Sequence, residues 1–170
     1  AQESGFTWGG TLELGVDSTV SSDDPTAEIA DTYGTVEAAF EAAITDRITL
    51  FGGVTLESVT DPIGSRQFDD IGLYVGELGL RFNLAPAILS VGKISPTFAI
   101  AWDETPGFYG TSLAEDYELS EVIGASLDYA LGDTGGTLSI AIFYADDTVL
   151  SDSLGTKRGR NTTAAGGIGN

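Results

Sequence analysis

Apolar and polar residues alternate with period two in several segments of this 170-residue chain. In the first such segment, from Phe6 to Asp17, the apolar side holds Phe6, Trp8, Leu12, Leu14 and Val16. Successive side chains of a β-strand point to opposite sides of a sheet, so this pattern predicts a strand with one apolar and one polar face. The further segments predicted as strands are residues 35–44, 48–57, 70–84, 87–94, 122–131 and 137–144. The sequence therefore predicts an all-β fold.

Residues 26–46 allow a second interpretation. A strand would place Phe40 on the apolar side and both Glu37 and Glu41 on the polar side. A helix would gather the apolar residues into one stripe and set the two glutamates four positions apart, among residues that form helices well. We favour the strand, because residues 46–47 then form a tight turn into the next predicted strand.

The connections between the predicted strands alternate strictly between long and short. Long connections begin at Ser18, Thr60 and Ser95, and short ones begin at Asp46, Ala85 and Gly132. Outer-membrane β-barrels have this asymmetry, with strands of about ten residues, short periplasmic turns and long external loops. No run of apolar residues approaches the roughly 18 to 20 that a transmembrane helix needs. We therefore expect an antiparallel transmembrane β-barrel.

Only about seven strands are predicted, whereas single-chain bacterial barrels have an even number of strands. The chain also ends in a glycine-rich segment rather than in a strand. We expect residues 1–170 to form the N-terminal part of a single barrel domain whose C-terminal strands are missing. The opening Ala1 and Gln2 resemble the start left after signal-peptide removal, which would follow export.

Charge and composition exclude several classes of function. The chain has 26 acidic and 7 basic residues, a net charge of −19, which argues against nucleic-acid binding and favours cations as partners. It has neither His nor Cys, so the commonest catalytic bases, thiolate nucleophiles and metal ligands are absent, and we expect no enzyme and no cofactor. Acidic pairs such as Asp23–Asp24, Asp69–Asp70 and Asp146–Asp147 could bind Ca²⁺ weakly, although solvated loop charge is the favoured interpretation.

Carboxylates concentrate on the polar sides of the predicted strands. These residues are Glu13, Asp17, Glu37, Glu41, Glu57 and Asp128. In a barrel they would point into a water-filled lumen, because a basic residue on the lipid side near mid-bilayer costs about 2–4 kcal/mol and an acidic one somewhat less. The alternative is a soluble, secreted, acidic β-sandwich acting as a binding module or adhesin, whose outer face would be equally polar.

A resemblance enters after the fifth predicted strand. The segments that carry it are Gly92-Lys93-Ile94-Ser95-Pro96, Ala101-Trp102-Asp103, Pro106-Gly107, Tyr109-Gly110 and Ala114-Glu115-Asp116-Tyr117-Glu118-Leu119. They resemble segments of Gram-negative outer-membrane porins, particularly the alphaproteobacterial general porins, in which Gly-Lys-aromatic-x-Pro ends a strand before a long loop. Ile94 stands where those porins usually have an aromatic residue.

The resemblance implies a barrel of about 16 strands, a homotrimer in the outer membrane among lipid and lipopolysaccharide, and passive diffusion of small hydrophilic solutes and ions. It implies that the third long loop, residues 95–118, folds inward and constricts the pore. Asp103, Glu104, Glu115 and Asp116 of that loop would then face Arg81 and Lys93 on the wall. Opposed charges across a constriction sort ions, and the acidic lumen favours cations.

Several of these residues have simpler interpretations. Arg81 and Lys93 could instead pair with neighbouring carboxylates or reach the membrane interface. The aromatic residues Trp8, Tyr74, Tyr129 and Tyr144 fit an interfacial belt. The only basic run, which contains Lys157, Arg158 and Arg160, is a candidate for binding lipopolysaccharide phosphate or an adjacent acidic loop.

Overall fold

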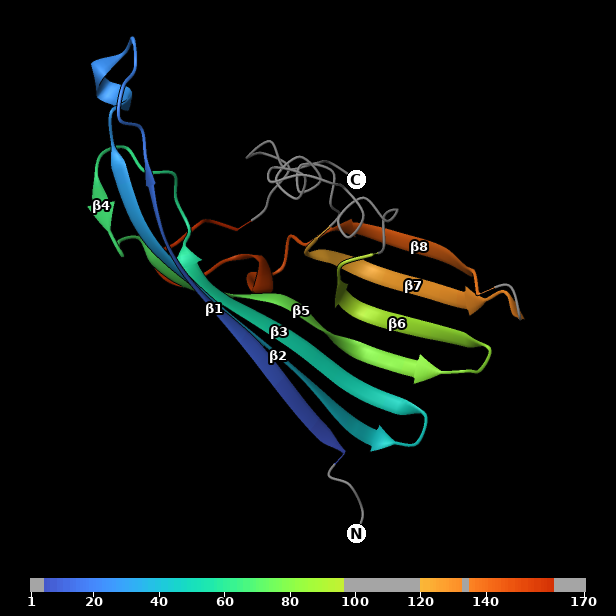
Figure 1. Cartoon of the computed structure of the whole chain (residues 1–170). Helices are drawn as coiled ribbons and strands as arrows, with labels where there is room; N and C mark the ends of the chain where they lie inside the picture. The colour runs from blue at the N-terminus through green and yellow to red at the C-terminus, as the bar shows by residue number, and fades with distance from the viewer. Residues whose placement is uncertain (1–4, 97–119, 133–134, 161–170) are drawn as a thin grey trace.

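The computed structural model describes residues 5–96, 120–132 and 135–160, and these residues form one β-sheet without an α-helix. Its strands are β1 (Phe6–Ser18), β2 (Ala30–Thr45), β3 (Ile48–Ser58), β4 (Arg66–Gln67), β5 (Ile71–Asn83), β6 (Ala87–Ile94), β7 (Val122–Ala130), β8 (Thr137–Ala145) and β9 (Leu154–Gly155). The sheet is accompanied by the 3-10 turns η1 (Pro25–Ala27) and η3 (Val149–Ser151). The all-β prediction is confirmed (Figure 1).

The seven long strands follow each other in the order β1-β2-β3-β5-β6-β7-β8, and every neighbouring pair is antiparallel. They correspond to the seven predicted strands. The strand interpretation of residues 26–46 is confirmed over Ala30–Thr45, and the helical one is wrong. In this register the apolar residues of β2 lie beside apolar residues of β1 and β3, and its polar residues lie beside their polar residues.

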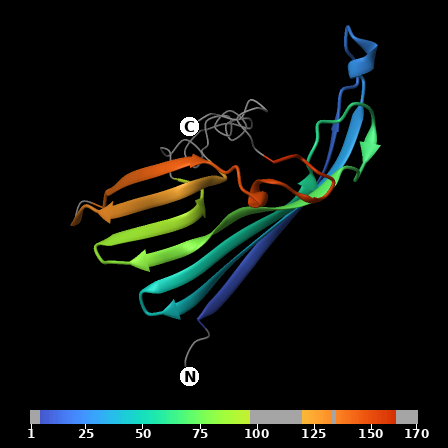
Figure 2. The same cartoon turned by 180° about the vertical axis from the view of Figure 1, so that it is seen from behind.

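The short strands β4 and β9 were not predicted. Each pairs with the part of a long strand that extends beyond the end of its neighbouring long strand. The β2–β3 ladder begins at Val36, so the earlier residues of β2 pair with β4 instead, Asp31 opposite Arg66. The β5–β6 ladder begins at Leu78, and the earlier part of β5 pairs with β9 instead. Residues 146–160, hereafter the return loop, therefore come back to the sheet (Figure 2).

A β-bulge in β5 changes which side chains share a face. Val54 of β3 is opposite Val75, whereas the preceding Gly53 is opposite Glu77, so Gly76 is the extra residue. Before the bulge the odd positions of β5 continue the apolar rows of β3, and after it the even positions do. Uninterrupted period two over residues 70–84 would put Tyr74 on the side of Leu78, and the bulge puts it on the opposite side.

The sheet is a single curved layer in both views, and η3 lies against β5 (Figures 1 and 2). Among the described residues the buried hydrophobic side chains are only Phe51, Ile94 and Val122. Large apolar side chains are instead exposed along one face, with Trp8 77% and Ile142 81% exposed. None of the described residues belongs to a helix long and apolar enough to span a membrane.

Candidate functional site

The strand register sorts the side chains into two faces. The apolar face holds the rows that contain Trp8, Phe40, Leu80, Leu127 and Ile140. The polar face holds all six carboxylates predicted to share a side. These are Glu13, Asp17, Glu37, Glu41, Glu57 and Asp128, whose cross-strand partners follow one continuous set of rows. Acidic side chains from β1, β2, β3 and β7 therefore lie on one surface.

Most of these carboxylates accept a hydrogen bond from a hydroxyl group on a neighbouring strand. The donor and acceptor pairs are Tyr33 with Glu13 at 3.1 Å, Thr11 with Glu37 at 3.1 Å, Tyr74 with Glu57 at 2.5 Å and Ser139 with Asp128 at 2.6 Å. Asp17 lies opposite Asp31. A hydroxyl donor stabilises the ionised carboxylate without cancelling its charge. The polar face therefore keeps its negative charge.

Arg81 is the basic residue of β5 on the polar face. Its side chain crosses β3 above the ring of Phe51, with the guanidinium carbon 5.0 Å from the ring centre, and forms an ion pair with Glu41 on β2. Gly79 lies opposite Phe51 and makes this arrangement possible, because a Cβ there would be 2.7 Å from the Phe51 ring. The pair is about half exposed. Arg81 thus gives the polar face one local positive charge beside its acidic rows.

Lys93 is the one charged residue of the seven long strands that does not lie on the polar face. The register sets it beside Leu78 and Ile123, and no other charged residue of the seven long strands falls in the apolar rows. Its side chain is fully buried, and its Nζ atom lies 3.0 Å from Asp146 and 2.9 Å from Glu121. Nζ also donates a hydrogen bond of 2.9 Å to the carbonyl oxygen of Leu150.

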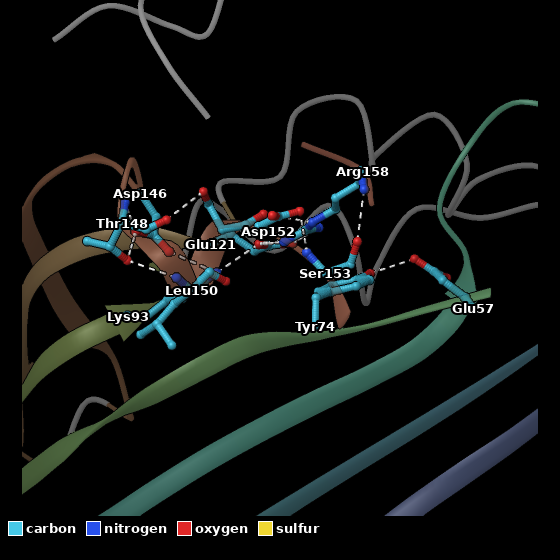
Figure 3. A network of polar contacts seen from close by, with 11 residues as sticks. Glu57, Tyr74, Lys93, Glu121, Asp146, Thr148, Leu150, Asp152, Ser153 and Arg158 are labelled. Atoms are coloured by element: carbon cyan, nitrogen blue, oxygen red, sulfur yellow. Dashed lines mark hydrogen bonds and ion pairs between the residues drawn. The ribbon is translucent and has the colours of Figure 1, made fainter. Parts of the chain in front are cut away.

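The contacts of Lys93 continue along a chain of residues that leads to the polar face (Figure 3). Arg158 of the return loop donates two hydrogen bonds, of 2.8 and 2.5 Å, to Glu121. Its guanidinium carbon lies 3.8 Å from the ring centre of Tyr74, whose hydroxyl donates to Glu57. We call this set the loop-end network; its members are Lys93, Asp146, Glu121, Arg158, Tyr74 and Glu57.

Electrostatics favour the charged forms of the loop residues in this network. Burial alone would raise the pKa of Asp146, but hydrogen bonds from Thr148 and Lys93 hold it below its ordinary value. Burial opposes the charged form of Arg158, yet the Glu121 carboxylate raises its pKa. A buried cation held by two carboxylates and a carbonyl is costly to break, because each partner would be left uncompensated. The network therefore fixes the return loop on the sheet.

A second ion pair fixes the connection between β3 and β5. Arg66 of β4 makes two contacts of 2.9 Å with the carboxylate of Asp31 on β2. The same guanidinium donates 2.7 Å to the carbonyl of Thr60 and lies 3.4 Å from Asp70. The β3–β5 connection and the return loop are thus attached to the sheet in the same way. Each has a short strand, β4 or β9, and a basic residue, Arg66 or Arg158, that forms an ion pair with a carboxylate.

The structure separates the residues predicted for a constriction. Arg81 lies on the polar face, whereas Lys93 belongs to an apolar row and its charge is enclosed by the loop-end network. Both are paired with carboxylates of the described chain, as the simpler interpretation has it. The acidic candidates of the 95–118 loop lie outside the described residues. They are Asp103, Glu104, Glu115 and Asp116.

In each acidic pair considered for Ca²⁺, at least one carboxylate contacts a protein group. Asp24 accepts hydrogen bonds from Thr26, Asp70 accepts from Thr60, and Asp146 contacts Lys93. Among residues 5–96, 120–132 and 135–160, no group of three or more acidic, His or Cys side chains is placed to hold a metal ion.

Sequence reasoning missed Glu121 and did not predict the roles of Asp146 and Arg158 in the loop-end network. Glu121 directly precedes β7 and Asp146 directly follows β8, so each stands one residue beyond the ladder whose last pair is Val122 with Ala145. The lone lysine in an otherwise apolar row was the available signal, because a buried charge needs partners. Finding those partners requires the path of the return loop.

Comparisons of the chain with protein-family models, with curated proteins and with solved structures give no match.

Proposed function

We propose that this chain forms part of the wall of a bacterial outer-membrane β-barrel that lets small hydrophilic solutes and ions diffuse passively, with a preference for cations. The observation that carries the proposal is the pair of faces of a single-layer sheet. One face exposes large apolar side chains from β1 to β8, and the other carries the six predicted carboxylates together with Asp31 and Glu77. Lipid outside and water inside match these two surfaces.

The arrangement of the loops supports the same proposal. Along the antiparallel order of the sheet, the short turns 46–47, 84–86 and 131–136 fall at one end and the longer connections at the other. In a barrel, β1 and β8 would each pair with a further strand, because unpaired backbone groups in lipid cost several kcal/mol each. Following the porin resemblance, the proposal includes an outer-membrane location and a homotrimer.

The acidic polar face supports the preference for cations. Four of the six carboxylates are held by neutral hydroxyl donors, so their negative charge is retained. Arg81 neutralises Glu41 alone among them. Rings of carboxylates in a water-filled pore concentrate cations and repel anions.

The alternative, a soluble acidic β-sandwich, requires a second sheet packed on the apolar face. The described residues form a single sheet, and large side chains of its apolar face are exposed, most strongly on β1 and β8. This comparison favours the membrane proposal.

Conductance tests the proposed function directly. The full-length protein, refolded in detergent and added to planar lipid bilayers under a KCl gradient, is expected to give discrete current steps and a reversal potential on the cation-selective side. Replacing Glu13, Glu37 and Asp128 by Gln or Asn should shift that potential toward zero. The absence of current steps, or anion selectivity, would contradict the proposal.

A further inference from the structure

A cleft of about 540 Å³ lies where the return loop meets the apolar face of the sheet. Leu73 and Val75 of β5 form the sheet side of the cleft, and Val149 and Leu154 form the loop side. The two loop residues are largely exposed. Their position continues the apolar face toward the long-loop end, where the proposed barrel would meet lipid headgroups.

Two cations line the same apolar cleft. The side chain of Lys157 is 59% exposed, lies 3.3 Å from Asp152 and donates to the carbonyl of Ser153. Arg160 is exposed, and its Nε donates to the carbonyl oxygen of Asp147. With Asp152 counted, the lining retains one net positive charge, although the whole chain carries −19.

The basic run of the sequence is thus divided between the two faces. Arg158 turns to the polar face, where it meets Glu121 and Tyr74, while Lys157 and Arg160 line the cleft. Arg158 forms an ion pair with Glu121. Among the described residues, the guanidinium of Arg160 forms no ion pair with a carboxylate, and its printed partner is the carbonyl oxygen of Asp147.

We propose that this cleft binds an anionic, phosphate-bearing lipid, with an acyl chain against Leu73 and Val75 and the phosphate beside Lys157 and Arg160. The cleft combines apolar side chains, which can contact an acyl chain, with basic side chains, which can reach a lipid phosphate at the membrane interface. The inference rests on the proposed membrane location and adds a specific lipid site to it.

Native mass spectrometry of the full chain in non-ionic detergent micelles tests the site. The probes are dioleoyl phosphatidic acid, dioleoylglycerol, which has the same chains without phosphate, and inorganic phosphate, which has no chains. We expect retention of phosphatidic acid, weaker retention of dioleoylglycerol and none of inorganic phosphate. The Lys157→Gln/Arg160→Gln variant should retain phosphatidic acid about tenfold less, since each basic group near a lipid surface contributes several-fold.

Two further variants separate charge from shape. Arg47→Gln removes a positive charge from the opposite, short-turn end of the sheet and should leave retention unchanged. Val149→Asp leaves both cations and should reduce retention of both lipids. The inference is overturned if the double variant retains phosphatidic acid as the parent does, if Arg47→Gln causes an equal loss, or if inorganic phosphate alone binds.

Flotation of the same preparation with phosphatidylcholine vesicles distinguishes this inference from the proposed function. If the chain floats with the vesicles but shows no preference for phosphatidic acid, only the inference of a lipid site is contradicted. If the chain does not float, the proposed membrane location itself is contradicted.

Discussion

The two faces of the sheet differ in how their side chains are satisfied. On the polar face, carboxylates meet hydroxyl donors from adjacent strands or the guanidinium of Arg81. On the apolar face, side chains such as Trp8 and Ile142 are more than three-quarters exposed. The polar side chains are well solvated when the polar face borders water, whereas the apolar face is stabilised by contact with a nonpolar environment. The difference indicates which surrounding each face is built for.

Lys93 sharpens this comparison because it is the charge that falls in an apolar row. The chain surrounds it with Asp146, Glu121 and the Leu150 carbonyl, rather than leaving it exposed. In the apolar rows of the seven long strands, the one charged side chain is thus enclosed by protein groups that take the place of its hydration shell.

The largest expected effect comes from removing that charge. Lys93→Met leaves Asp146 buried without its cation, and loss of one partner of a buried ion pair typically costs about 3–5 kcal/mol of unfolding free energy. The measurement is urea unfolding in lipid vesicles. Lys157→Met is the matched control, because it removes a largely exposed lysine paired with Asp152 and should cost less than about 1 kcal/mol. Equal losses would contradict a buried network.

A new charge on the apolar face should have the next largest effect. Ile142→Arg places a cation in the proposed lipid layer and should cost about 2–4 kcal/mol in vesicles. Its neighbour Ala141 belongs to the polar rows, so Ala141→Arg at nearly the same depth should be far milder. Urea unfolding again measures both. If the two substitutions are equally tolerated, the faces do not have different surroundings.

Packing on the polar face depends on Gly79. A Cβ there would lie 2.5 Å from the carbonyl oxygen of Val91 and 2.7 Å from Phe51, so Gly79→Ala should destabilise the chain by about 1–3 kcal/mol. Gly76, at the bulge, has nothing within 4 Å of the same position, and Gly76→Ala should have a smaller effect. A reversed order of the two unfolding midpoints would exclude the close contact of β5 with Phe51.

The smallest effect expected is the acid dependence of the return loop. The pKa of Asp146 is lower in the folded chain than its ordinary value of 3.8, so its contribution is present above that value and is lost as the pH falls through the folded pKa. Asp146→Asn should therefore flatten the decline in unfolding free energy between about pH 5 and pH 2. An unchanged slope in the variant would show that other carboxylates cause the decline.

Period two was enough to predict the seven long strands and the common face of six carboxylates, because strand side chains alternate by geometry. The side of Tyr74 could not be predicted, since the bulge at Gly76 is visible only in the pairing with β3. Strands β4 and β9 depend on how far β2 and β5 outrun their neighbours, which is a property of the whole sheet. The partners of Lys93 escaped prediction for the same reason.

Water and lipid accessibility along β8 tests the central claim most directly. The chain has no cysteine, so single cysteines at positions 138–144 give unambiguous labels in the vesicle-inserted protein. We predict that fluorophores at 138, 140, 142 and 144 are quenched by nitroxides on lipid acyl chains, while cysteines at 139, 141 and 143 react with a water-soluble maleimide. Uniform reaction with maleimide and no quenching by the acyl-chain nitroxides would contradict the account.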